Sequence, residues 1–172
     1  VQSLRQSEGH RDHSSGRIHA YYFGTGCQLS PNFYVSVKGL HTDSTADNPG
    51  PKTAPPPKRD TFNNQNDTGV LTVSNQFEWG EGYLKGWVDR GYNNWEEPND
   101  DGNTPWQNYG LRARQTVRLG PVELLAGVDG TFLGAEFIQE GLNGKRIDAV
   151  RYDIWHLWEP YAGISLMLGD RD

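Results

Sequence analysis

The chain has 172 residues and a formal net charge of -6, and 34% of its residues are hydrophobic. This length suits one ordinary globular domain, and the arginines alternate with apolar residues instead of forming a basic block, so we expect no nucleic-acid partner. Cys27 is the single cysteine, which excludes an internal disulfide and a cysteine metal cluster, and no run of about 20 apolar residues predicts a transmembrane helix.

Residues 1–16 are polar, and we predict that they form a solvated loop. His10 and His13 lie three positions apart, but no set of carboxylates and cysteines completes a metal site around them. We therefore predict no bound metal and no cofactor.

The first stretch with strand character covers residues 17–40 and contains a turn at residues 30–31. Folding the chain at that turn places Gly26 opposite Val35, so that a small residue faces a large one across the hairpin. In this register Cys27 lies on the opposite, more polar face, where we interpret it as a small half-buried side chain and not as a nucleophile.

A segment rich in Pro and Asn, at about residues 43–67, is predicted to be a long loop, because proline supplies no donor to a sheet interior. A second hairpin follows over residues 69–89, and the glycine of its turn at residues 80–81 suits type II′ geometry. This turn sets Phe77 against Leu84.

The clearest pattern covers residues 106–137, after a polar loop that we predict at about residues 93–105. Apolar and polar residues alternate over about ten positions on each side of a turn at residues 120–121, as in strands with one apolar and one polar face. The antiparallel register across this turn brings opposite charges together in two pairs, Arg118 with Glu123 and Arg112 with Asp129.

A third long loop, at about residues 134–153, leads to a last strand, and we count about seven strands in all. The tight turns fall at one end of the sheet and the long loops at the other, an asymmetry typical of outer-membrane barrels. An odd number of antiparallel strands cannot close regularly, and open edges are not tolerated in lipid. We therefore predict an all-β fold, an antiparallel up-and-down transmembrane β-barrel segment, in which residues 1–172 form one part of a larger barrel.

Aromatic residues gather near both ends of the predicted strands, as two interfacial girdles require. Phe33 and Trp79 lie near the tight turns, and the group near the long loops consists of Tyr22, Tyr92, Trp106, Tyr109 and Trp158. The alternative explanation is that aromatic residues simply favour strands.

Several stretches resemble the TonB-dependent outer-membrane receptors. They are residues 5–14, 28–32, 40–43, 48–50, 109–112 (YGLR), 126–129 (AGVD) and 159–162 (EPYA). The resemblance implies a barrel of about 22 strands with an N-terminal plug, in the outer membrane of a Gram-negative bacterium. It also implies uptake of a scarce ligand, such as a ferric siderophore or cobalamin, driven by TonB. The chain departs from the family because it has no TonB box, no plug and no terminal strand, so we expect that it cannot perform the transport cycle by itself.

The charged residues of the predicted polar face are the candidate ligand-contacting or lumen-facing residues. They are Lys85, Asp89, Arg112, Arg114, Arg118, Glu123 and Asp129. These charges either contact a ligand or only solvate the lumen and fix the register. The expected partners are outer-membrane lipid, the strands or chains that complete the barrel and, by resemblance, the TonB system.

Two other functions are compatible with the composition. A soluble β-sandwich carbohydrate-binding module would use four loop aromatics as stacking platforms: Trp95, Trp106, Trp155 and Trp158. An outer-membrane hydrolase would take its base from His19, His41 or His156, but the sequence has no nucleophile elbow and no convincing pair of carboxylates. We therefore predict no catalytic residues and no enzyme.

Overall fold

The computed structural model describes residues 2–7, 14–48, 60–97, 100–141 and 146–166, and the regular elements in these residues are all β-strands. The strands are β1 (Gln2–Ser7), β2 (Gly16–Ser30), β3 (Phe33–Asp47), β4 (Thr61–Phe77), β5 (Gly80–Glu96), β6 (Asp100–Leu119), β7 (Val122–Gly141) and β8 (Arg146–Leu166). His10 and His13, the histidines considered for a metal site, lie outside the described residues.

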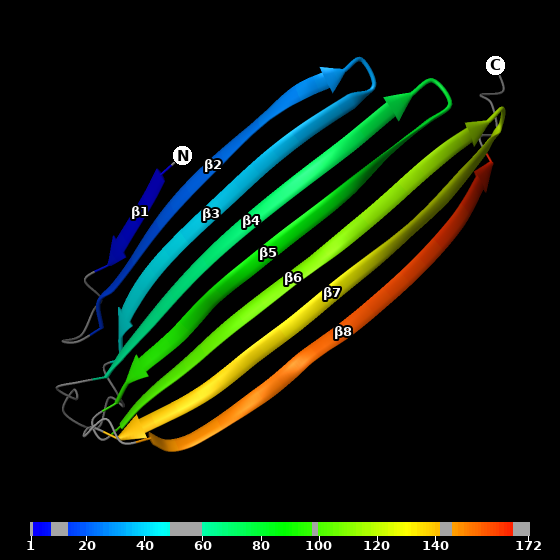
Figure 1. Cartoon of the computed structure of the whole chain (residues 1–172). Coiled ribbons are helices and arrows are strands. Elements are labelled where there is room, and N and C mark those ends of the chain that lie inside the picture. The colour runs from blue at the N-terminus through cyan, green and yellow to red at the C-terminus, as the bar shows by residue number, and fades with distance from the viewer. Residues whose placement is uncertain (1, 8–13, 49–59, 98–99, 142–145, 167–172) are drawn as a thin grey trace.

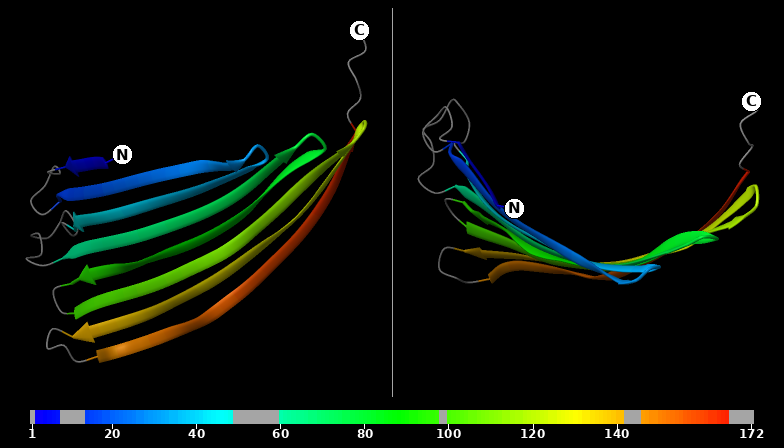
Figure 2. Two further views of the ribbon diagram at one scale, coloured as in Figure 1. Left: turned by 45° about the horizontal axis from the view of Figure 1, so that its top comes forward. Right: turned by 90° about the horizontal axis from the view of Figure 1, so that it is seen from above.

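The strands form one antiparallel meander in which each strand pairs with its neighbours in the sequence, in the order β1 to β8 (Figure 1). The sheet is curved and twisted, and β1 and β8 lie at its two separate edges, so the sheet is not closed into a barrel (Figure 2). The turns β2–β3, β4–β5 and β6–β7 lie together at one end of the sheet (Figure 1). The prediction of an all-β up-and-down sheet is therefore confirmed, whereas the described strands number eight and not seven.

The third predicted hairpin, β6–β7, has the register expected from the sequence. Leu119 pairs with Val122, and Gly120 between them has a φ of 61°, the left-handed value that a glycine adopts without strain. Arg118 faces Glu123, and Arg112 faces Asp129. The alternating pattern and the charge pairs were sufficient here because both strands reach the turn without a bulge.

The predicted register of the first hairpin, β2–β3, is wrong by one residue. Ser30 pairs with Phe33, and a bulge between Gln28 and Ser30 shifts the ladder so that Cys27 faces Val35. A one-residue shift moves side chains to the other face. Cys27 is therefore exposed on the same face as Val35, and Gly26 is not Val35's partner.

The predicted turn of the second hairpin, β4–β5, is also wrong. Phe77 pairs with Gly80, so residues 78–79 form the turn, and Val73 rather than Phe77 faces Leu84. Gly80 is instead needed for close packing, because a Cβ at this position would overlap the carbonyl oxygen of Thr116 on β6. The glycine that suggested a turn thus marks a close approach between strands.

The strands extend into segments for which loops were predicted. β3 continues to Asp47 and β4 begins at Thr61, so parts of the segment 43–67 are paired. Only residues 97–99 separate β5 from β6, and only residues 142–145 separate β7 from β8. The prediction relied on alternation of apolar and polar residues, which disappears where both faces of a sheet are polar, although the backbone ladder continues.

The N-terminal residues 2–7 form β1, which pairs with β2, where we had expected a loop. No second sheet covers the first one within the described residues, and none of their hydrophobic side chains is buried. The sandwich architecture of the alternative hypothesis is therefore not found in the described residues.

Candidate functional site

The two faces of the sheet differ sharply in chemistry. Direct cross-strand partners share a face and side chains alternate along each strand, so the register assigns each residue to a face. One row of the face that we call the apolar face consists of Cys27, Val35, Val73, Leu84, Ala113, Val128 and Pro160. The adjacent row of the opposite face, the polar face, consists of Gly26, Ser36, Thr72, Lys85, Arg112, Asp129 and Glu159.

The apolar face carries a continuous apolar band next to the tight turns. On β4 to β7 this band covers residues 69–77, 80–88, 109–119 and 122–132, each about 9 to 11 residues long. Its amide side chains on these strands, Asn75 and Gln115, lie in one row and bond to each other, with Asn75 Nδ2 donating to Gln115 Oε1 at 3.2 Å. Their polar groups are thus partly satisfied inside the band.

Aromatic rings border the apolar band at both ends. Near the tight turns, Phe77 stacks on Trp79 at 4.9 Å between ring centroids and meets Phe33 edge to face at 5.6 Å. At the other border, Phe132 stacks on Tyr109 at 4.8 Å and contacts Trp158. Two members of the predicted girdle, Tyr22 and Trp106, lie instead on the polar face, because the observed register assigns them there.

All seven predicted ligand-contacting or lumen-facing residues lie on the polar face. Arg112 and Asp129 form a two-pronged ion pair, with nitrogen–oxygen distances of 2.7 and 2.6 Å. Arg118 lies between two carboxylates, 3.4 Å from Glu123 and 3.6 Å from Glu81. These contacts fix the register across β5, β6 and β7.

The other three residues of the predicted set have different surroundings. Asp89 accepts a hydrogen bond of 2.6 Å from the hydroxyl of Thr68. Lys85 Nζ lies 5.9 Å from the ring centroid of Trp87. Arg114 lines an open depression of about 390 Å³ on the polar face, beside Tyr83.

The four tryptophans predicted as loop aromatics all lie within strands. Trp95 is in β5, Trp106 is in β6, and Trp155 and Trp158 are in β8. Trp158 is on the apolar face and the other three are on the polar face. They do not form a common stacking platform, because they are divided between the two faces. They lie in strands and not in loops because the strands are longer than the alternating pattern indicated.

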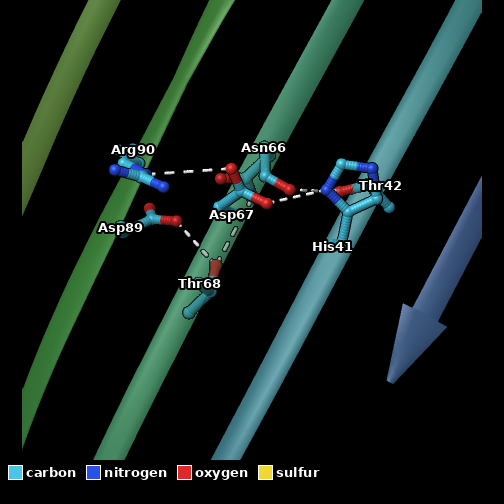
Figure 3. Close-up of polar contacts among 7 residues, drawn as sticks. All are labelled: His41, Thr42, Asn66, Asp67, Thr68, Asp89 and Arg90. Atoms are coloured by element: carbon cyan, nitrogen blue, oxygen red, sulfur yellow. Dashed lines mark hydrogen bonds and ion pairs between the residues drawn. The ribbon is translucent and has the colours of Figure 1, made fainter. Parts of the chain in front are cut away.

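Just beyond the apolar band, the apolar face carries a group that we call the rim cluster: His41, Asp67 and Arg90 (Figure 3). These residues are direct cross-strand partners on β3, β4 and β5. Nδ1 of His41 lies 2.7 Å from Oδ1 of Asp67, and Nε of Arg90 lies 3.8 Å from Oδ2 of the same carboxylate. The neighbouring bond from Thr68 to Asp89 lies on the polar face.

The rim cluster favours the charged form of Asp67. Its hydrogen bond with His41 lowers the pKa of the Asp67 carboxyl below the ordinary value. Partial burial is the next largest influence and raises this pKa, and the charges of His41 and Arg90 lower it by smaller amounts. The side chain of Asp67 is 37% exposed, so its carboxylate is accessible to water.

Sequence reasoning missed the rim cluster for two physical reasons. Asp67 was assigned to a loop, and the predicted turn at residues 80–81 would have paired Asp67 with Asn94 instead of Arg90. The cluster follows once residues 78–79 are taken as the turn. The partner of Asp67 on β3 could not be found in this way, because no tight turn joins β3 to β4.

Comparisons of the chain with protein-family models, with curated proteins and with solved structures found no match. The described part of the chain contains no group of three or more His, Cys, Asp or Glu side chains that could hold a metal ion. It also contains no helix that is long and apolar enough to cross a membrane.

Proposed function

We propose that the chain is a segment of an outer-membrane receptor or transporter barrel, which further strands of the same protein or other chains complete. The main support is the exposed apolar face. Leu84, Leu124 and Ile164 are 48%, 39% and 72% exposed, and no second layer covers them within the described residues. A continuous apolar surface of this kind is unfavourable in water, and acyl chains of lipid cover it well.

The dimensions of the apolar band support the same proposal. A tilted strand crosses the hydrocarbon core of a bilayer in about 9 to 11 residues, which is the length of the band on β4 to β7. Aromatic rings at both borders match the girdles of membrane barrels. The polar strand ends beyond the band then extend out of the membrane.

The polar face would line the lumen of the completed barrel. Paired charges such as Arg112 and Asp129 are tolerated there because water fills or borders the lumen. By the resemblance to TonB-dependent receptors, we propose that the barrel takes up a scarce ligand, such as a ferric siderophore or cobalamin. This step is tested by comparing the accumulation of both radiolabelled ligands in cells with and without the protein and TonB.

Cys27 gives a direct test of the orientation, because it is the single cysteine and is exposed in the middle of the apolar band. The thiol is labelled with bimane in membranes that contain the full protein. Lipids with a spin label on the acyl chain are then added as quenchers. We expect strong quenching of the bimane fluorescence, because the proposed orientation places residue 27 against the acyl chains.

The matched control carries the label on the polar face. Lys38 is exposed on that face, so Lys38→Cys in a Cys27→Ser background places the same probe in the proposed lumen. We expect weak quenching by the lipid spin label and strong quenching by iodide in water. Equal quenching of the two probes by the lipid spin label would contradict the proposal.

A further inference from the structure

Three tryptophans on the polar face each cover a glycine of the neighbouring strand, and we call this row of rings the indole track. A Cβ at any of the three glycines would overlap the indole opposite it. The tryptophans are half-buried, so part of each indole remains accessible. The rings are Trp87, Trp106 and Trp95, and their cross-strand partners are Gly110, Gly91 and Gly102.

The indole track follows the ladder between β5 and β6. Trp87 and Trp95 belong to β5, and Trp106 belongs to β6 but lies opposite position 91 of β5. The rings therefore occupy the levels of residues 87, 91 and 95, and four residues of a strand span about 13 Å. The three indoles repeat at equal steps, from alternate strands, over about 26 Å.

Covering a glycine with an aromatic ring is also a way to pack a sheet. Trp158 on the apolar face covers its cross-strand partner Gly130 in the same manner. A ring over a glycine is therefore not sufficient to identify a binding site. The side chains around the indole track supply the second observation.

The rows between the indoles carry hydrogen-bonding side chains. One row lies between the levels of Trp87 and Trp106, and the next lies between the levels of Trp106 and Trp95. The first row on β4, β5 and β6 consists of Thr68, Asp89 and Asn108, and the second consists of Asn64, Asn93 and Thr104. Amides and hydroxyls thus alternate with indoles along the track.

This part of the polar face is nearly neutral. Asp89 is its one charged residue within residues 62–70, 87–95 and 102–110, and the hydroxyl of Thr68 donates to one of its carboxylate oxygens at 2.6 Å. Asn64 donates to the side-chain oxygen of Asn93, which leaves the amide nitrogen of Asn93 as a donor. The ion pairs of the polar face lie nearer the tight turns, from Arg112 onward.

This arrangement matches the surface of a neutral sugar chain. A glucose ring, whose hydroxyls are mostly equatorial, has broad faces of C–H groups that stack on an indole. Its rim of hydroxyls exchanges hydrogen bonds with amides, hydroxyls and carboxylates. An anionic ligand, by contrast, would meet no cationic side chain of the polar face within residues 62–70, 87–95 and 102–110.

We infer that the indole track binds a neutral glucose oligosaccharide, whose rings stack on the three indoles and whose hydroxyls bond to Asp89 and the neighbouring amides. The inference deepens the proposed function and rests on it in one respect, because the polar face lines a lumen only if the apolar face meets lipid. Within that function it names a sugar chain as a ligand of the lumen wall.

The indole track is tested by isothermal titration calorimetry of the full protein in a zwitterionic detergent that has no sugar headgroup. The probes are maltohexaose and cellohexaose, two neutral glucose oligomers that differ only in their linkage. We expect at least one of them to bind, and its disaccharide to bind about tenfold more weakly, because a disaccharide cannot stack on all three indoles. Absence of binding by both hexasaccharides, or equal affinity for the disaccharide, would overturn the inference.

Substitution of the central indole tests the contact itself. Trp106→Leu should weaken binding of the hexasaccharide about tenfold, and Trp106→Phe, which keeps a ring over Gly91, should weaken it less. The matched control is Trp158→Leu, which removes a ring that covers a glycine on the apolar face and should leave the affinity unchanged. Equal losses of affinity in Trp106→Leu and Trp158→Leu would show that both rings act through packing alone, and the inference would fail.

The Cys27 label separates this inference from the proposed function. Unchanged lipid quenching of bimane in the Trp106→Leu variant shows that the sheet still folds and faces lipid, so a loss of affinity reports on the track alone. Quenching in the original protein without binding of either hexasaccharide refutes only the sugar site. Absence of quenching in the original protein refutes the proposed function, whatever the calorimetry shows.

Discussion

At the scale of single residues, the ion pairs of the polar face are the contacts that specify strand register. Arg112 and Asp129 meet in direct opposition on β6 and β7, and the side chain of Asp129 is only 19% exposed. A two-pronged pair with one half-buried partner is stronger than an ordinary surface pair, because its geometry is fixed and water screens it less.

We expect a measurable coupling between Arg112 and Asp129. Arg112→Ala and Asp129→Ala should each destabilise the protein, and the double variant should cost less than their sum by about 1 kcal/mol. Urea unfolding of the protein in lipid vesicles, followed by tryptophan fluorescence, measures the three free energies. A matched pair, Lys38 with Asp129, lies on strands that do not touch and should give additive effects. Additivity for Arg112 and Asp129 as well would show that the pair contributes no net stability.

At the scale of a strand, apolar and charged side chains alternate along the half of β6 that is next to the β6–β7 turn. They therefore lie on opposite faces of the sheet. Ala113 lies in the middle of the apolar band, whereas Gln107 lies on the same face and the same strand but beyond the band. The two positions therefore differ mainly in depth relative to the proposed membrane.

A charge introduced at these two positions should have very different costs. Ala113→Arg is expected to destabilise the protein by about 2 to 4 kcal/mol, because arginine near the bilayer midplane loses hydration, and Gln107→Arg by about 0 to 1 kcal/mol. Urea titration of folding into phosphatidylcholine vesicles measures both values. Similar small costs at the two positions would indicate that this face contacts water and not lipid.

At the scale of the whole molecule, the sheet has two edges whose backbone groups lack partners within the described residues. β8 pairs only with β7, and β2 extends past β1 from Tyr22 to Ser30. With eight strands in alternating directions, the outer edges of β1 and β8 run antiparallel to each other. The described strands number eight instead of the predicted seven, so the argument that an odd number of strands cannot close on itself no longer applies.

Closure by further strands should protect the edge amides. In an open sheet about half of the amides of an edge strand point to water and exchange quickly, whereas a paired strand protects nearly all of them. Hydrogen exchange with mass spectrometry on the full protein should show peptides of residues 155–166 as protected as those of residues 109–119. Fast exchange of about half of the amides in residues 155–166 would show that β8 is a free edge.

The sequence alone determined the all-β class, the third hairpin with its charge pairs, and the common face of Arg112, Arg118 and Asp129. These features depend on local alternation around a turn without a bulge. Only the tertiary structure decided the bulge near Gln28, the turn at residues 78–79 and the rim cluster. The reason is that a bulge or a close strand approach depends on a neighbouring strand, and residues such as Asp67 and Arg90 meet only when the register between strands is known.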